Sequence, residues 1–398
     1  MARTLLLAFF VLTGPLLLSP VGDAGALDST GLVPLTDMGA QTYLSFGGGL
    51  YENGSNDAPA DHAATGMARA ASVQPLDTNG DPNAGGKIVL LSVGMSNTTQ
   101  EFCSGNSALP CAAWTFMGQA ALDARVNHST LTIVNGAAGG QTAQTWDMPT
   151  DPNYARVLDT RLTPQGLSEA QVQVVWVKVA DAGPTSSLPA TSADAYNLET
   201  YTGNIMRALK VRYPNVKLVF VSSRIYAGYA TTTLNPEPYA YESGFAMKWL
   251  VQAQIDQMRN GGTPVDPRAG DLNYNTVAPW VAWGPYLWAD GVLPRSDGLT
   301  WLQGDLVSDG THPSQSGQEK VGTMLLDFFL GSPFTSPWFD SAPVGGIAEP
   351  PDVAGASAAA ETSGGGASGA WIALAAAVAG AAIVLGGVGW WAKGRRVR

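Results

Sequence analysis

The sequence predicts an α/β protein with three layers, in which a mainly parallel sheet lies between two layers of helices. From Lys87 onward, short apolar runs alternate with longer segments of helical periodicity. Strands that alternate with helices of this length pair in parallel through right-handed crossovers. The chain has 398 residues, of which 45% are hydrophobic, and this is enough to bury such a core.

The expected elements follow one another in a regular order. Apolar runs of five to nine residues that end at turn residues are typical of buried strands. Apolar residues at helical spacing mark the helices; Ser192 is the expected N-cap of one, and Gly331 ends the last. The predicted strands are 87–93, 129–135, 171–179, 216–222 and 279–283; the predicted helices are 112–126, 193–213, one from about 239 to the glycine pair 261–262, and 315–330.

Composition excludes several classes of protein. The chain has 21 Lys and Arg against 32 Asp and Glu, a net charge of -11. This balance argues against a nucleic-acid partner, because binding a phosphate backbone requires clustered basic residues. Three His and two Cys are too few for a disulfide framework, a cysteine-cluster zinc site or a His-rich metal site.

The N-terminus resembles a secretory signal. Arg3 precedes an apolar run at residues 5–18, and the small residues 24–26 offer a cleavage site. We therefore expect residues 1–26 to be removed on export. The alternative, an uncleaved anchor, requires a longer apolar span than this one.

The C-terminus resembles a membrane anchor. Residues 371–391 carry no charge, have Trp at both ends and are followed by four basic residues. At about 1.5 Å per residue the stretch spans roughly 30 Å, the thickness of a bilayer core. The basic cluster places the tail 392–398 in the cytoplasm and the main body outside. A buried core helix and a sorting signal removed after export are the alternatives.

Between the two ends we expect an acidic exported region. Without the leader, which contains Arg3 and Asp23, and without the four basic residues of the tail, 16 basic and 31 acidic residues remain, a net charge of -15. Residues 27–86 lack periodicity and predict an irregular extension packed on a main domain at 87–341; the Gly-, Ala-, Ser- and Pro-rich stretch 342–370 predicts a linker. In an oxidising compartment Cys103 and Cys111 can form a local disulfide, and free buried thiols are the alternative.

Candidate chemistry lies where the strands end, since ligands of such sheets bind beyond the carboxyl ends of the strands. Ser96 follows the first strand on a turn that begins with Gly94, but a serine requires a base. His62 and His128 are expected on the surface. His312 instead follows Asp309 by three positions, and such a loop can place a carboxylate on one imidazole nitrogen and the nucleophile on the other.

The second strand runs into a loop with three glycines between residues 136 and 140. Glycines leave backbone N–H groups accessible, and such groups can hold an oxyanion. The sequence therefore predicts a nucleophile, a base with its carboxylate, and an oxyanion loop at neighbouring strand ends.

These residues resemble the SGNH/GDSL hydrolases, a family of esterases and lipases with a three-layer α/β/α fold. Gly94–Asn97 (Gly-Met-Ser-Asn) is similar to the nucleophile block, above all to the Gly-Gln-Ser-Asn form of sialate O-acetylesterases and related carbohydrate esterases. Gly140–Thr142 is similar to the oxyanion-glycine block, and Asp309–Pro313 to the block with the catalytic Asp and His. The resemblance covers residues 87–331 and implies Ser96, Asp309 and His312 as the triad, with no metal or organic cofactor.

The third block departs from the family pattern. Where the family has Gly-x-Asn-Asp, this chain reads Lys178-Val179-Ala180-Asp181, so the side-chain amide is missing. Loss of one oxyanion donor costs about 3 kcal/mol in barrier, which slows an esterase rather than abolishing it. Besides the backbone N–H groups of Ser96 and Gly140, we expect Asn97 or Lys178 to substitute, ahead of Asp181, which can donate only when protonated.

Two other stretches offer substrate-binding candidates. Arg224 and Tyr226 follow the strand at 216–222, and Trp288 belongs to an aromatic stretch at 280–290 that suits sugar rings or acyl chains. Structural roles are the alternative for all three.

The leading interpretation is an exported, membrane-anchored serine hydrolase that cleaves an ester of a small molecule or polysaccharide through an acyl-enzyme at Ser96. Acetylated carbohydrate is the preferred substrate, on the resemblance of the nucleophile block and the external location. The alternatives are a surface binding protein with weak or no catalysis, which Ala180 suggests, and a purely structural surface protein. The sequence does not indicate an oligomeric state.

Overall fold

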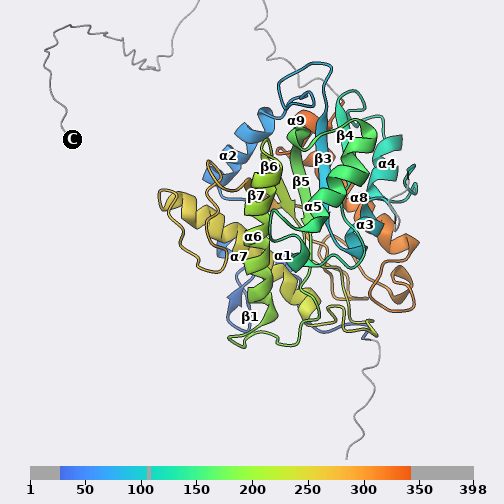
Figure 1. The fold of residues 1–398 in the computed structure, drawn as a ribbon. Coiled ribbons are helices and arrows are strands. Elements are labelled where there is room, and N and C mark those ends of the chain that lie inside the picture. Colours follow the sequence, from blue (N-terminus) through green and yellow to red (C-terminus); the bar gives the residue numbers. More distant parts are fainter. Residues whose placement is uncertain (1–26, 105–108, 342–398) are drawn as a thin grey trace, which may run out of the picture. The chain divides into compact units, whose positions relative to one another are not determined.

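The computed structural model describes residues 27–104 and 109–341, and its centre is one five-stranded sheet (Figure 1). The strand order is β4-β3-β5-β6-β7, and every neighbouring pair is parallel. The predicted fold class is confirmed. The strands are β3 (Ile88–Gly94), β4 (Leu131–Asn135), β5 (Val172–Lys178), β6 (Leu218–Val221) and β7 (Trp280–Trp283).

Helices cover both faces of this sheet (Figure 1). On one face α6 and α7 pack against each other, and on the other α3, α4 and α8 do so. Paired residues of β5 and β6 point to this second face: Trp176 stacks on Phe102 of α3, and Phe220 contacts Phe328 of α8. The helices are α3 (Ser96–Phe102), α4 (Phe116–Leu122), α5 (Pro152–Val157), α6 (Asp194–Arg212), α7 (Tyr239–Arg259), α8 (Gln315–Gly331) and α9 (Ser336–Phe339).

The central strands are buried along their whole length, as strands covered on both faces must be. Every residue of β3 and β5 is buried. The two strands are in parallel register, with Gly94 opposite Lys178. The carboxyl ends of β3 and β5 therefore lie side by side at the same end of the sheet, and the segments that follow them are neighbours.

The N-terminal segment is more regular than the sequence predicts. Residues 27–86 contain α1 (Leu35–Met38), a hairpin of β1 (Thr42–Tyr43) and β2 (Phe46–Gly47), and the twelve-residue helix α2 (Ala60–Ala71). Helix α2 packs through small residues: a Cβ on Gly66 would lie 2.3 Å from the ring of Trp280. The buried residues of α2 are His62, Gly66 and Ala70, none of which is a large apolar residue. The expected irregular structure was wrong. The division at residue 86 stays a prediction.

Local differences concern helix ends and one extra helix. Helix α4 begins after Thr115, whose hydroxyl accepts from the N–H of Gly118 at 3.4 Å, and it is shorter than predicted. Helix α6 begins after Ala193, without a side-chain cap, so the N-cap prediction for Ser192 was wrong. The sequence analysis did not predict α3, because Asn and Thr are weak helix formers; burial of most of its residues stabilises it.

In the described part of the chain, no helix combines the length and apolar character needed to cross a bilayer. The predicted signal 1–26, linker 342–370, span 371–391 and tail 392–398 all lie outside the described residues. They stay predictions.

Candidate active site

Ser96 is the first residue of α3, two residues beyond the end of β3. It is partly exposed, whereas Met95 and Asn97 on either side are buried. The turn that presents it requires a glycine: a Cβ on Gly94 would lie 2.2 Å from the carbonyl oxygen of Lys178. Close approach of two backbones therefore places the hydroxyl at the edge of the sheet.

The loop before α8 holds an aspartate and a histidine in one rigid turn. Gly310 has φ +64°, and a Cβ there would lie 1.8 Å from the carbonyl oxygen of Tyr229, so only glycine fits. The Asp309 carboxylate accepts the backbone N–H of Thr311 at 2.8 Å and that of His312 at 2.9 Å. These two bonds hold the Asp309 carboxylate in place independently of its contact with the His312 imidazole.

Ser96, His312 and Asp309 form one hydrogen-bonded chain. The distance from Asp309 Oδ2 to His312 Nδ1 is 2.6 Å, and that from His312 Nε2 to Ser96 Oγ is 2.8 Å. An ionised carboxylate only accepts, so Nδ1 carries the proton and Nε2 is free to accept from the hydroxyl. The structure thus brings together the three residues that the sequence singled out, and their catalytic role stays a prediction.

The charge state of Asp309 suits this arrangement. Partial burial opposes its ionisation, but the hydrogen bonds from the His312 N–H, the His312 imidazole and the Thr311 N–H outweigh it, and the pKa of Asp309 is lowered. The side chains of His312 and Asp309 are 21% and 30% exposed. The imidazole is therefore accessible from solvent and faces an anionic partner.

Gly139 and Gly140 lie across from Ser96. A Cβ on Gly139 would lie 4.0 Å from Ser96 Cβ, and one on Gly140 would meet nothing within 4 Å. Within the described ranges, the backbone N–H groups of Ser96 and Gly140 donate to no other residue. Both are available to an oxyanion formed at Ser96.

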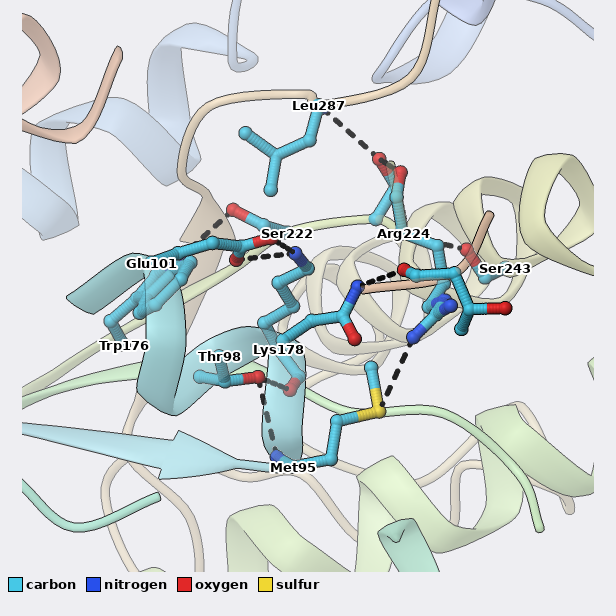
Figure 2. Close-up of polar contacts among 12 residues, drawn as sticks. Met95, Thr98, Glu101, Trp176, Lys178, Ser222, Arg224, Ser243 and Leu287 are labelled. Atoms are coloured by element: carbon cyan, nitrogen blue, oxygen red, sulfur yellow. Dashed lines mark hydrogen bonds and ion pairs between the residues drawn. The ribbon is translucent and has the colours of Figure 1, made fainter. Parts of the chain in front are cut away.

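The side chains predicted to assist these N–H groups are engaged elsewhere. Asn97 is 1% exposed, and its Nδ2 donates to the carbonyl oxygen of Thr311 at 3.0 Å. The Lys178 ammonium is fully buried and lies 2.5 Å from both carboxylate oxygens of Glu101 (Figure 2). These contacts argue against both as oxyanion donors. Asn97 instead links α3 to the loop that contains His312.

The third block contributes no side-chain donor in the described structure. Ala180 is buried, and its carbonyl oxygen accepts the N–H of Ala143 at 2.9 Å. Asp181 accepts hydrogen bonds from the Gln144 side chain and, at 2.7 Å, from the Ala182 N–H. Burial raises the pKa of Asp181 despite these bonds. Among the predicted oxyanion groups, only the backbone N–H groups of Ser96 and Gly140 are unengaged.

The three predicted substrate-binding residues are buried. Arg224 is 2% exposed, and its guanidinium points toward Met95 Sδ at 3.5 Å (Figure 2). The Tyr226 hydroxyl donates to the carbonyl oxygen of Leu27 at 2.7 Å, and Trp288 Nε1 donates to Glu237 at 2.8 Å. All three belong to the core, so the binding-wall interpretation of the aromatic stretch was wrong.

Other predicted features are settled by local contacts. Cys103 and Cys111 form a disulfide, as expected. His128 is exposed, but His62 is 4% exposed, and its Nε2 lies 2.8 Å from the carbonyl oxygen of Val281. The expectation that His62 lies on the surface was therefore wrong. Among the described residues, no cluster of three or more His, Cys, Asp or Glu could hold a metal ion.

The contacts that hold α3 in place were not predicted from the sequence. The Asn97–Thr311 bond, the Thr98–Lys178 bond and the Glu101–Lys178 pair all join α3 to segments distant in sequence. A signal existed for the ion pair alone, since Lys178 is the one charged residue of the buried strand β5 and requires a buried anion. Its partner could not be identified without the fold.

Neither a protein-family model nor a curated protein sequence matches the chain. Solved structures similar to it include an extracellular lipase from Streptomyces rimosus (15% identity, 60% of this chain, 97% of that chain, TM-score 0.27) and a carbohydrate acetylesterase from Sinorhizobium meliloti (16%, 61%, 97%, 0.30). A salicylyl-acyltransferase from a tetracycline biosynthetic pathway is also similar (14%, 61%, 54%, 0.28). TM-scores of this size carry no argument about function, so we derive the chemistry from this chain's own residues.

Proposed function

We propose that the protein is a serine hydrolase that cleaves an ester by acyl transfer to Ser96. The observation that supports it most is the hydrogen-bonded chain from Asp309 through His312 to Ser96, with distances of 2.6 and 2.8 Å. A serine hydroxyl is inert at neutral pH unless a positioned base accepts its proton. Both imidazole nitrogens of His312 have the partners that this role requires.

The reaction then has two halves. His312 Nε2 takes the hydroxyl proton as Ser96 Oγ attacks the ester carbonyl carbon, and the carbonyl oxygen becomes an oxyanion. The imidazolium returns the proton to the leaving alkoxide as the carbon–oxygen bond breaks, which leaves an acyl-enzyme. Water, deprotonated by the same nitrogen, attacks the acyl carbon. The bond from this carbon to Ser96 Oγ then breaks, the imidazolium returns the proton to Oγ, and the acid is released. Asp309 stabilises the imidazolium in both halves.

We propose that backbone groups hold the oxyanion. The N–H groups of Ser96 and Gly140 have no partner within the described ranges, and Gly139, the neighbour of Gly140, lies close to Ser96. With Ala180 in the third block, no side-chain amide joins them. An oxyanion site with one donor fewer is expected to cost about 10²–10³ in kcat relative to a three-donor site.

The substrate that we propose is an O-acetyl ester of a carbohydrate, outside the cytoplasm. The proposal is supported by the similarity of Gly94–Asn97 to the nucleophile block of carbohydrate esterases and by the predicted signal and anchor. We likewise propose that the domain is exported and anchored by residues 371–391. A panel of acetylated sugars compared with aryl esters of increasing acyl length tests the substrate class.

The test of the reaction is a pair of substitutions. Ser96→Ala and His312→Ala should each remove turnover of a short-chain aryl ester, and an organophosphate should label a peptide that contains Ser96 only in proteins that retain His312. Wild-type turnover that persists in both variants would contradict the proposal. A folded wild-type protein that neither turns over esters nor reacts with the organophosphate would instead indicate a binding protein.

A further inference from the structure

A single residue of the central strand holds the nucleophile helix at two points. The backbone carbonyl of Lys178, the last residue of β5, accepts the hydroxyl of Thr98 at 2.6 Å, and its ammonium contacts Glu101 (Figure 2). Thr98 Oγ1 in turn accepts the backbone N–H of Met95 at 3.3 Å. The first contact lies two residues after Ser96, and the second lies in the last turn of α3.

The ion pair is fully desolvated. Both side chains are 0% exposed, and the ammonium is 2.5 Å from each carboxylate oxygen. Burial lowers the pKa of Lys178 to about 8 and raises that of Glu101, since each charge is disfavoured away from water. The positive charges of Lys178 and Arg224 act in the opposite direction on Glu101.

Stability alone does not account for such a pair. Replacing a buried ion pair with apolar residues of similar volume is often neutral or stabilising, whereas removing one partner is strongly destabilising. At a core site, a pair of apolar side chains is therefore an alternative that avoids the cost of removing two charges from water. A retained pair at this position requires another explanation, and its geometry supplies one.

The contacts of Lys178 converge on the turn that presents the nucleophile. The carbonyl oxygen of Lys178 approaches so closely that Gly94 has no room for a side chain. Helix α3 has only seven residues, so its direction depends on what holds its ends. A displacement of about 1 Å at a reacting group can cost 10²-fold in rate.

We propose that Lys178 and Glu101 are positioning residues, whose buried ion pair fixes α3 so that Ser96 Oγ stays in line with His312. The inference rests on the proposed hydrolase function and assigns a role to the position at which the third block departs from the family pattern. Neither side chain touches the substrate; both act through the helix that bears the nucleophile.

The test removes the charges without leaving one of them unpaired. In the double variant Glu101→Leu/Lys178→Met, the packing volume is approximately kept, and we expect a melting temperature equal to or above that of the wild type. We expect kcat to fall about 10- to 100-fold while KM changes less than about two-fold, because the substrate surface is intact. The rate of organophosphate labelling of Ser96 should fall by a similar factor.

A second pair provides the matched control. Glu169 and Arg212 form an ion pair at the other end of β5, with side chains 22% and 24% exposed. The variant Glu169→Leu/Arg212→Met should leave kcat unchanged. If Glu101→Leu/Lys178→Met does not fold, Glu101→Gln/Lys178→Met keeps the shape of the carboxylate side chain without leaving a buried charge, and it should lower kcat about 10-fold at unchanged KM.

The outcomes separate this inference from the proposed function. Wild-type turnover that Ser96→Ala abolishes, together with a folded pair variant of undiminished kcat and labelling rate, would overturn only the positioning role. A wild-type protein that turns over no ester and is not labelled would overturn the hydrolase proposal and, with it, the role of the pair. The inference is supported if Glu101→Leu/Lys178→Met loses kcat but keeps its melting temperature, and if the control variant Glu169→Leu/Arg212→Met does not lose kcat.

Discussion

The regions around His312 and His62 use the same side chain in opposite ways. At the carboxyl edge of the sheet, His312 is 21% exposed and lies between Asp309 and Ser96. On α2, His62 is 4% exposed, stacks on Trp280 with ring centroids 4.7 Å apart, and contacts the carbonyl oxygen of Val281. One imidazole is set between two reactive groups, whereas the other fills a core.

The difference shows what makes a histidine chemically useful in this fold. A base must be able to accept a proton and then hold the charge. At His312 a carboxylate can stabilise the imidazolium. At His62 burial lowers the pKa to about 4, although the carbonyl of Val281 and the charge of Asp61 favour the protonated form. Solvent access and a bonded carboxylate, rather than the residue type, distinguish the two regions.

The largest effect on activity is expected when the carboxylate is removed from the His312 region. In Asp309→Asn the amide can donate to Nδ1, which stabilises the tautomer that leaves Nε2 unable to accept the serine proton. We expect kcat to fall about 10⁴-fold, as it does when a triad aspartate becomes asparagine. Ester turnover and the melting temperature, measured together, check the prediction. A loss smaller than 10-fold in a folded variant would show that His312 does not depend on Asp309.

The His62 region predicts a pH effect on stability instead. Because the pKa of His62 is about 4 in the folded protein and about 6.5 in an unfolded chain, only the unfolded chain binds this proton between those values. Stability should therefore fall as the pH drops from 6.5 to 4, by about 3 kcal/mol in total. Urea unfolding of the wild type and of His62→Gln, whose amide can donate to Val281, measures the difference.

In that experiment the variant should show a flatter pH profile between 4 and 6.5 than the wild type. Equal slopes for wild type and His62→Gln would mean that His62 is protonated in the folded protein, and the contrast with His312 would be lost.

How much of the molecule could be predicted depended on how locally each feature is encoded. The strands and long helices follow from runs of apolar residues. Ser96 lies in a short motif after β3, and Asp309 and His312 lie in a short motif before α8. The orientation of single side chains is not local. Four residues were predicted to lie at the site because they end or follow its strands, yet their side chains are buried in the core, since their partners come from segments distant in sequence. These residues are Lys178, Arg224, Tyr226 and Trp288.

The predictions for helix α2 and His62 were wrong for a related reason. The helix buries Gly66 and Ala70 as well as His62, so its buried face has few large apolar residues and periodicity did not reveal it. Because irregular structure was predicted for this segment, His62 was predicted to lie on the surface. Close packing against Trp280, which only small residues allow, can be recognised only when both partners are placed.

The smallest of the expected effects concerns the bond that keeps the His312 loop beside the nucleophile. Asn97→Ala removes the donor to the carbonyl oxygen of Thr311, which lies one residue before His312. We expect a loss of about 1–3 kcal/mol in unfolding free energy from the unpaired carbonyl and a decrease of about 10-fold in kcat from the loosened loop. Asn215→Ala, which removes a similar bond to the carbonyl of Ala170 at 2.8 Å, should destabilise comparably and leave kcat unchanged. A kcat that falls equally in both variants would mean that general destabilisation, rather than the Asn97–Thr311 bond, controls the distance between Ser96 and His312.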